Sequence, residues 1–213
     1  DKDFSDAVYG VEEDGRYVTE SRLKKMLSHE VNLIEKRLSR EKHPNKMFFS
    51  YANTVATIDF AKQFKGHGWV GISYQIEPDE DYNEIILHIR FKETDVRLQQ
   101  ETLGILGVNL IYGAYYKYND PKRLLRYLYD HLDKDQLEID TINFSGPRFA
   151  DVDNRLMSLQ LVKNGMTDAV MFNPDGKNIL PAAILYKKNI LAFRGSFRPV
   201  TKVNMDMYEK SLK

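Results

Sequence analysis

The sequence predicts an α/β fold with a Rossmann-like, parallel β-α-β-α-β C-terminal half. An N-terminal layer, made of a helix and an antiparallel β-hairpin, is expected to precede it. In residues 133–213, short apolar runs alternate with amphipathic stretches, which is typical of parallel strands joined by helices. Residues 69–76 and 83–91 flank an acidic turn and suit two paired strands, which predicts the hairpin. With 213 residues, 42% of them hydrophobic, the chain is long enough to bury a sizeable core.

The N-terminal part is expected to contain an arm, a helix and a strand before the hairpin. Residues 1–17 are polar and punctuated by glycine, so we expect an extended arm. A helix is expected to begin at Thr19, a good N-cap, and to end before Pro44. Residues 46–60 are rich in aromatic and β-branched side chains and are expected to contain a strand.

Two helices are expected between the hairpin and the C-terminal half. The first spans residues 94–118, and its second half is apolar nearly all round, which indicates burial on most sides. Asp120-Pro121 opens the second helix, because Asp is a favoured N-cap and Pro suits the first helical position. The longest uncharged run, residues 102–116, is shorter than the ~20 residues that a membrane-spanning helix needs. We therefore expect a soluble, cytoplasmic protein without a membrane span.

The C-terminal half is expected to alternate strands with helices. The predicted strands span residues 136–144, 168–172 and 190–193, and the predicted helices span residues 151–164, 181–187 and 204–212. The most plausible domain boundary lies near residue 133, which gives parts 1–132 and 133–213. The chain has no clear linker, so one continuous domain is the alternative.

Three polar loops follow the three predicted strands of the C-terminal half. Because the carboxyl ends of parallel strands share one edge of a sheet, these loops are expected to converge there. Arginine forks and hydroxyl groups suit a phosphate or a carboxylate, and an aspartate beside them suits a metal ligand or a base. The expected ligand-binding residues are Ser145, Arg148, Asp175, Arg194, Ser196 and Arg198. The alternative is that these are ordinary polar loops with surface arginines.

Two motif-like patterns and the histidines give no firm evidence for a catalytic, nucleotide or metal site. VMFNPDGK is similar to a haloacid-dehalogenase motif, but Asn173 stands where the nucleophilic Asp is needed, which favours a turn. GHGWVG, residues 66–71, matches G-x-G-x-x-G but opens a predicted strand, whereas a dinucleotide fingerprint opens a helix. His67 beside Trp69 is a candidate pocket residue, although a lone histidine is more often structural. The other histidines show no metal-ligand spacing, so the sequence identifies no metal site and no cofactor.

Several stretches spread along the chain resemble a known group of sequences. They are YVTESRLKKML (17–27), ANTVATI (52–58), HGWVGI (67–72), LQQETLGILGVNLIY (98–112), DKDQLEIDTINFSGP (133–147), VDNRLMSLQLVKNGMT (152–167) and LYKKNILAFRGSFRPVT (185–201). The group is a poorly characterised bacterial protein family that bears two labels, nicotinate-nucleotide adenylyltransferase and TonB-dependent receptor. Its members are longer at both ends, so the resemblance implies that this chain is a central fragment.

The chain lacks the sequence features that either family label requires. An adenylyltransferase needs a His-x-Gly-His type motif after its first strand, and Gly66-His67-Gly68-Trp69 is not that motif. The receptor label needs many alternating strands, whereas at least four strong helices are expected here. No catalytic residue is therefore carried over from the family.

The composition narrows the choice of function without deciding it. Thirty-one basic residues balance 31 acidic ones, which argues against a general nucleic-acid binder. The chain has no cysteine, so disulfides, thiolate metal sites and cysteine nucleophiles are excluded. The leading hypothesis is a domain that binds a small anionic ligand, with a nucleotide as one example and nucleotidyl or phosphoryl transfer as the reaction if there is one. The alternative is a non-catalytic scaffold or regulatory module, for which a homo-oligomer is expected.

Overall fold

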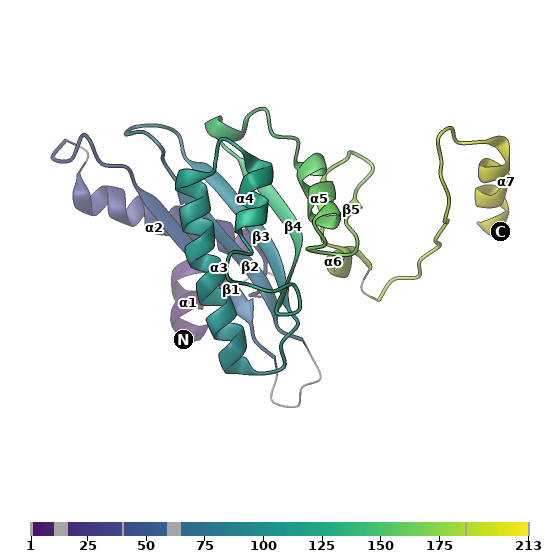
Figure 1. Ribbon diagram of the computed structural model, residues 1–213, viewed down its shortest axis with the longest axis horizontal. Coiled ribbons are helices and arrows are strands. Elements are labelled where there is room, and N and C mark those ends of the chain that lie inside the picture. Colours follow the sequence, from purple (N-terminus) through teal and green to yellow (C-terminus); the bar gives the residue numbers. More distant parts are fainter. Residues whose placement is uncertain (1, 11–16, 40, 59–64, 186, 213) are drawn as a thin grey trace. The chain divides into compact units, whose positions relative to one another are not determined.

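The computed structural model describes residues 2–10, 17–39, 41–58, 65–185 and 187–212. It divides the chain into two compact units, Asp1–Pro181 and Ala182–Lys213. The first unit is built on a four-stranded sheet, in which each strand is hydrogen-bonded to the next in sequence (Figure 1). The strands are β1 (Phe49–Ala56), β2 (His67–Tyr74), β3 (Asn83–Phe91) and β4 (Leu137–Ser145).

Every pairing in this sheet is antiparallel, so the predicted Rossmann-like parallel unit is wrong. The predicted strand at residues 136–144 is β4, but it runs antiparallel beside β3. The predicted strand at 168–172 shortens to β5 (Met171–Phe172), which pairs with β6 (Asn178–Ile179) in a separate two-stranded antiparallel sheet. Residues 190–193 form no strand, and Ile190 and Leu191 are exposed.

A pair of helices explains why β4 returns antiparallel. The first helix, α3 (Val96–Tyr116), runs back along the sheet after β3, and α4 (Pro121–Tyr127) packs against it in the opposite direction. Leu124 contacts Gly113, whereas the side chain of Asn109 reaches the carbonyls of Leu128 and Asp130. The chain therefore comes back to the end of the sheet that it left, and β4 runs antiparallel to β3. A single crossover helix would instead have returned the chain to the opposite end of the sheet, which gives a parallel strand.

The local N-terminal predictions are largely confirmed. The helix α2 (Glu20–Leu38) is capped by Thr19, whose hydroxyl accepts a hydrogen bond from the backbone N–H of Arg22. Strands β2 and β3 form the predicted hairpin. The extended arm is wrong for its first residues, which form the helix α1 (Lys2–Tyr9). The rest of the predicted arm falls largely on residues 11–16, outside the described residues.

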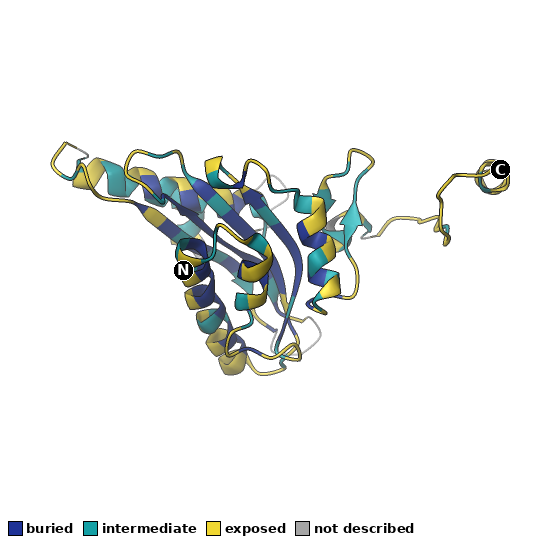
Figure 2. Ribbon diagram, turned by 45° about the horizontal axis from the view of Figure 1, so that its top comes forward, coloured by how far each residue is buried: buried dark blue, intermediate teal, exposed yellow. Residues whose placement is uncertain are grey.

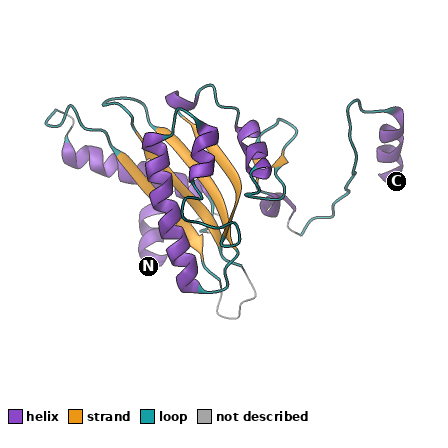
Figure 3. Ribbon diagram, viewed as in Figure 1, coloured by secondary structure: helices purple, strands orange, loops and turns teal. Residues whose placement is uncertain are grey.

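The sheet is covered on both faces by helices (Figure 3). One face packs against α3 and α4 and forms the larger core, which Figure 2 shows as buried segments of strand and helix. On the other face, Leu23 and Leu27 of α2 pack over Gly71, where an added Cβ would lie only 3.0–3.1 Å from their methyl groups. The absence of a side chain at Gly71 therefore lets α2 lie close to the sheet.

The remaining predicted helices are present near their expected bounds. They are α5 (Asn154–Lys163), α6 (Pro181–Leu185) and α7 (Lys202–Ser211), with a short 3-10 helix at Pro147–Phe149. Thr201 caps α7 by accepting a hydrogen bond from the N–H of Asn204. Among the described residues, none of the helices has the length and apolar character needed to cross a membrane.

A buried glutamine joins α3 to the chain beyond β1 and provides a test of this packing. The Gln99 carbonyl accepts a hydrogen bond from the N–H of Ile58, and its amide donates to the carbonyl of Glu93. We expect Gln99→Ala to lower the free energy of unfolding by about 1–3 kcal/mol, because both backbone groups lose a partner. The matched control is Gln100→Ala at the exposed neighbouring position, which should stay within about 0.5 kcal/mol. Urea unfolding of both variants makes the measurement, and equal stabilities would contradict this packing.

Candidate acid–base site

Three of the six predicted ligand-binding residues lie in the first unit. Ser145 ends β4, and its hydroxyl hydrogen-bonds the carboxyl group of Glu84. Burial raises the pKa of Glu84, and the hydrogen bond from Ser145 acts in the opposite direction. Asp175 lies in the turn between β5 and β6, where Gly176 adopts a positive φ of 77° and donates its N–H to the carbonyl of Asn173. The turn predicted at this position is confirmed.

Arg148 is engaged by the loop that joins β2 to β3. Its guanidinium contacts Glu80 at 2.5 Å and Glu77 at 2.9 Å. Its backbone N–H donates to the side chain of Asn83 at 2.8 Å. In this arrangement Arg148 holds the hairpin loop against the end of β4.

The other three predicted residues, Arg194, Ser196 and Arg198, lie in the second unit. They are exposed and occupy the irregular segment between α6 and α7. The convergence of all six residues rested on the carboxyl ends of parallel strands, and the antiparallel sheet removes that reason. Anion binding by the arginine loop itself stays a prediction.

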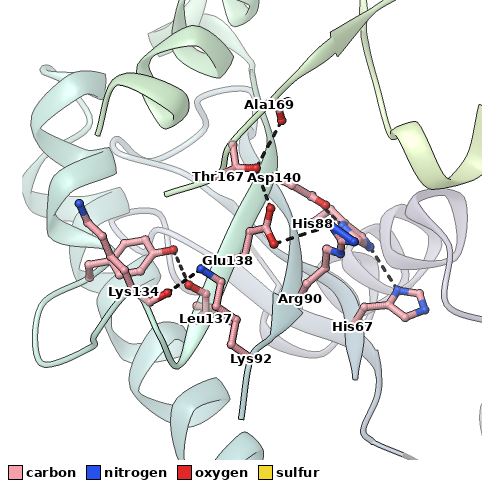
Figure 4. A network of polar contacts seen from close by, with 11 residues as sticks. His67, His88, Arg90, Lys92, Lys134, Leu137, Glu138, Asp140, Thr167 and Ala169 are labelled. Carbon is pink, nitrogen blue, oxygen red and sulfur yellow. Dashed lines mark hydrogen bonds and ion pairs between the residues drawn. The ribbon is translucent and has the colours of Figure 1, made fainter. Parts of the chain in front are cut away.

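A different group of side chains comes together on the sheet face that α2 partly covers. The His88 ring nitrogen Nδ1 lies 2.7 Å from the carboxylate oxygen Oδ1 of Asp140. The other ring nitrogen of His88, Nε2, lies 3.2 Å from Nδ1 of His67. Figure 4 shows these residues in a row across β4, β3 and β2. We call this hydrogen-bonded row, Asp140–His88–His67, the histidine relay.

The strand register explains why two histidines meet. His67 and Trp69 are two residues apart on β2 and therefore share a face. His88 on β3 lies directly opposite Trp69, so it is the diagonal neighbour of His67. The Trp69 ring packs edge-on against the His88 ring, with 4.9 Å between ring centroids, and limits the positions that His88 can take.

Asp140 reaches the row through a β-bulge in β4. The pairing of β3 with β4 shifts by one residue between His88 and Ile89, so that Thr141 lies opposite His88 and Asp140 is the extra residue. The core-facing positions of β4 show this shift. They are odd-numbered before the bulge, at Leu137 and Ile139, and even-numbered after it, at Ile142. The bulge thus adds an acidic side chain to the polar face while the apolar residues stay in the core.

The inner members of the relay are shielded from solvent. The side chains of His88 and Asp140 are 3% and 7% exposed. In this setting His88 donates its Nδ1–H to the carboxylate, which leaves Nε2 to face His67. His67 is only partly buried. Burial, and then the neighbouring His88, lowers the pKa of His67, whereas Asp140 raises it and Arg90 lowers it.

Arg90 and Glu138 border the outer end of the relay. Arg90 lies opposite His67 in the pairing of β2 with β3, and it faces Glu138 in the pairing of β3 with β4. The Arg90 guanidinium is 53% exposed and lies 3.7 Å from the Glu138 carboxylate. Thr167 donates its hydroxyl to the same carboxylate at 2.7 Å. The half-buried imidazole of His67 therefore lies beside a loosely paired, exposed cation.

The sequence contained part of the evidence for this site. Extending the predicted hairpin by two residues places His67 and His88 on one face. The consecutive polar residues Asp140-Thr141, between apolar positions of opposite parity, indicate the bulge. Treating each histidine alone missed the relay because the contact is made across strands.

Neither a metal site nor a known relative assigns a role to the relay. Among the described residues, no group of three or more His, Asp or Glu side chains is arranged to hold a metal ion. No family model matches the chain, and searches of curated proteins and of solved structures found no significant match. The resemblance to a bacterial family therefore stays a prediction.

The charges around His67 predict opposite responses to two substitutions. Asp140→Asn should lower the pKa of His67 further, because it removes the carboxylate that favours the imidazolium. Arg90→Gln should raise it, because it removes a cation that opposes protonation. Titrating the His67 ring protons by NMR, assigned with His67→Gln, measures both shifts. Shifts of the same sign in the two variants would contradict this electrostatic arrangement.

Proposed function

We propose that this protein is an acid–base catalyst that acts on a small anionic substrate, with His67 as the group that exchanges a proton with it. The observation behind the proposal is the continuous row of hydrogen bonds from a buried carboxylate, through a buried imidazole, to a half-buried one. General bases in enzymes are commonly imidazoles that a second, fixed group orients.

The relay gives His67 a defined way to accept a proton. With both imidazoles neutral, His88 donates its Nδ1–H to Asp140 and accepts the Nδ1–H of His67, which leaves the Nε2 lone pair of His67 available. When Nε2 takes a proton from a water molecule or a substrate hydroxyl, the Nδ1 proton of His67 can pass to Nε2 of His88. The positive charge then lies next to the Asp140 carboxylate, which stabilises it.

Arg90 supports an anionic substrate. It lies on the strand next to His67, exposes half of its guanidinium and is held by Glu138 only at 3.7 Å. An arginine with donors that are not used by a close ion pair can bind a carboxylate or a phosphate in a defined orientation. A substrate anchored there has its reacting group within reach of the relay, so Arg90 and His67 together suit hydrolysis or proton transfer next to an acidic group.

Turnover of model esters tests the proposal. We expect the protein to hydrolyse the mono-4-nitrophenyl ester of terephthalate, whose carboxylate cannot reach its own ester group, faster than neutral 4-nitrophenyl benzoate. His67→Gln should lower the rate by about 10²-fold or more, the usual contribution of general acid–base catalysis. Arg90→Gln should remove the preference for the charged ester. Because it also raises the pKa of His67, it should shift the pH profile on the neutral ester to higher pH without abolishing that activity. Release of 4-nitrophenolate, followed across pH, gives both measurements.

His43→Gln is the matched control for ester turnover, because His43 lies on the loop between α2 and β1, outside the relay. It should leave both rates unchanged. Equal activity in His67→Gln and the unsubstituted protein would refute catalysis by the relay. An equal loss on both esters in Arg90→Gln would refute the role of Arg90 in substrate choice.

The arginine loop of the second unit supports a second candidate function, the binding of a phosphate or carboxylate ligand. Arg194 and Arg198 are both exposed, and neither forms an ion pair within the described residues. We expect titration calorimetry with inorganic phosphate to show binding that the double variant Arg194→Ala/Arg198→Ala loses. Lys210→Ala, a change of cation elsewhere in the same unit, is the control. Unchanged binding in the double variant would rule this loop out as the anion site.

A further inference from the structure

A cleft of about 500 Å³ opens where the end of α3 meets α4. This volume is within the range of small-molecule sites. The cleft lies beside the helices that cover one face of the sheet, whereas the histidine relay lies on the opposite face. Its lining combines tyrosines with basic side chains. The residues that line it include Tyr112, Lys117, Arg123, Arg126, Tyr127 and Asp130. We call this site the tyrosine cleft.

Tyrosine rings form a row along this cleft. Tyr112 stacks on Tyr116 with 4.5 Å between ring centroids and an interplanar angle of 28°. Tyr112 also packs against Tyr127, with 4.9 Å between the ring centroids and an interplanar angle of 31°. Because Tyr112 lies between these two rings, a further ring would stack at the end of the row, on Tyr127, which lines the cleft and is only partly buried. Near-parallel rings of this kind are a suitable surface for one more planar ring.

The charge of the cleft is positive although the charges of the whole chain balance. Lys117, Arg123 and Arg126 oppose the single carboxylate of Asp130. The Lys117 ammonium lies 5.8 Å from the Tyr112 ring centroid and 5.9 Å from that of Tyr127, so part of this charge lies directly over the aromatic row. The Tyr127 hydroxyl donates a hydrogen bond to the Asp130 carboxylate. Burial, and then this carboxylate, raises the pKa of Tyr127. The two arginines are exposed on α4.

We propose that the tyrosine cleft binds a mononucleotide, with the base stacked on the tyrosine row and the phosphate held by Arg123 and Arg126. A planar base and an anionic group on one small molecule match the two kinds of surface that the cleft places together. The size of the cleft and the balanced charge of the chain favour a single nucleotide over a long nucleic acid, which needs an extended basic surface. This site is independent of the histidine relay.

Titration calorimetry with four ligands tests the proposal on the unsubstituted protein. The ligands are adenosine monophosphate, adenosine, ribose 5-phosphate and a single-stranded oligoadenylate. Adenosine monophosphate should bind at least about tenfold more tightly than adenosine or ribose 5-phosphate, because only it uses both the rings and the arginines. No binding of adenosine monophosphate up to about 1 mM would overturn the proposal. Measurable binding of the oligonucleotide alone would assign the surface to nucleic acid and would also overturn it.

Two pairs of variants locate the ligand within the cleft. Tyr127→Leu should weaken binding of adenosine monophosphate about fivefold or more, whereas Tyr127→Phe keeps the ring and should preserve binding. Arg126→Gln should also weaken it about fivefold or more, whereas Lys122→Gln, an exposed cation on the same helix outside the cleft lining, should not. Arg126 is exposed, so its substitution tests the site even if Tyr127→Leu folds poorly. Equal effects of Arg126→Gln and Lys122→Gln would overturn the assignment.

Discussion

The antiparallel pairing of β4 with β3 is the constraint on which the rest of this structure depends. It adds the fourth strand to the sheet and places apolar residues of β4, such as Ile142, in the larger core. It also sets the carboxylate of Asp140 against His88. The pairing requires that the chain return to the end of the sheet that it left after β3. The helices α3 and α4 make that return, and the tyrosine cleft lies where they meet.

The sequence predicted the local elements well because their causes are local. Thr19 and Asp120 cap helices through their own side chains, and the hairpin of β2 and β3 has an acidic turn between its strands. Strand direction was not predictable in the same way, since a short apolar run packs equally well in a parallel or an antiparallel sheet. The expectation of a parallel sheet rested on the alternation of short apolar runs with single helices in residues 133–213, and only the first of those runs joins the four-stranded sheet.

The candidate sites differ in how far the sequence could reveal them. Arg194 and Arg198 are four positions apart in one short loop, so the sequence alone drew attention to them, and their role stays a prediction. His67 and Asp140 are 73 positions apart and are connected only through the pairings of three strands. Tyr112 and Tyr127 come from different helices, and their stacking depends on the turn between α3 and α4. Contacts of this kind depend on the tertiary fold, which residue spacing does not specify.

The β-bulge in β4 has a consequence for how this protein can change over evolutionary time. Because Asp140 is an extra residue, a chain without it would pair Thr141 with His88 in a regular ladder, and Leu137, Ile139 and Ile142 would still face the core. The acidic end of the relay is thus an insertion that the sheet does not need for its own stability. A single-codon insertion or deletion can therefore gain or lose the Asp140–His88 hydrogen bond while the strand pairing on both sides of the bulge persists.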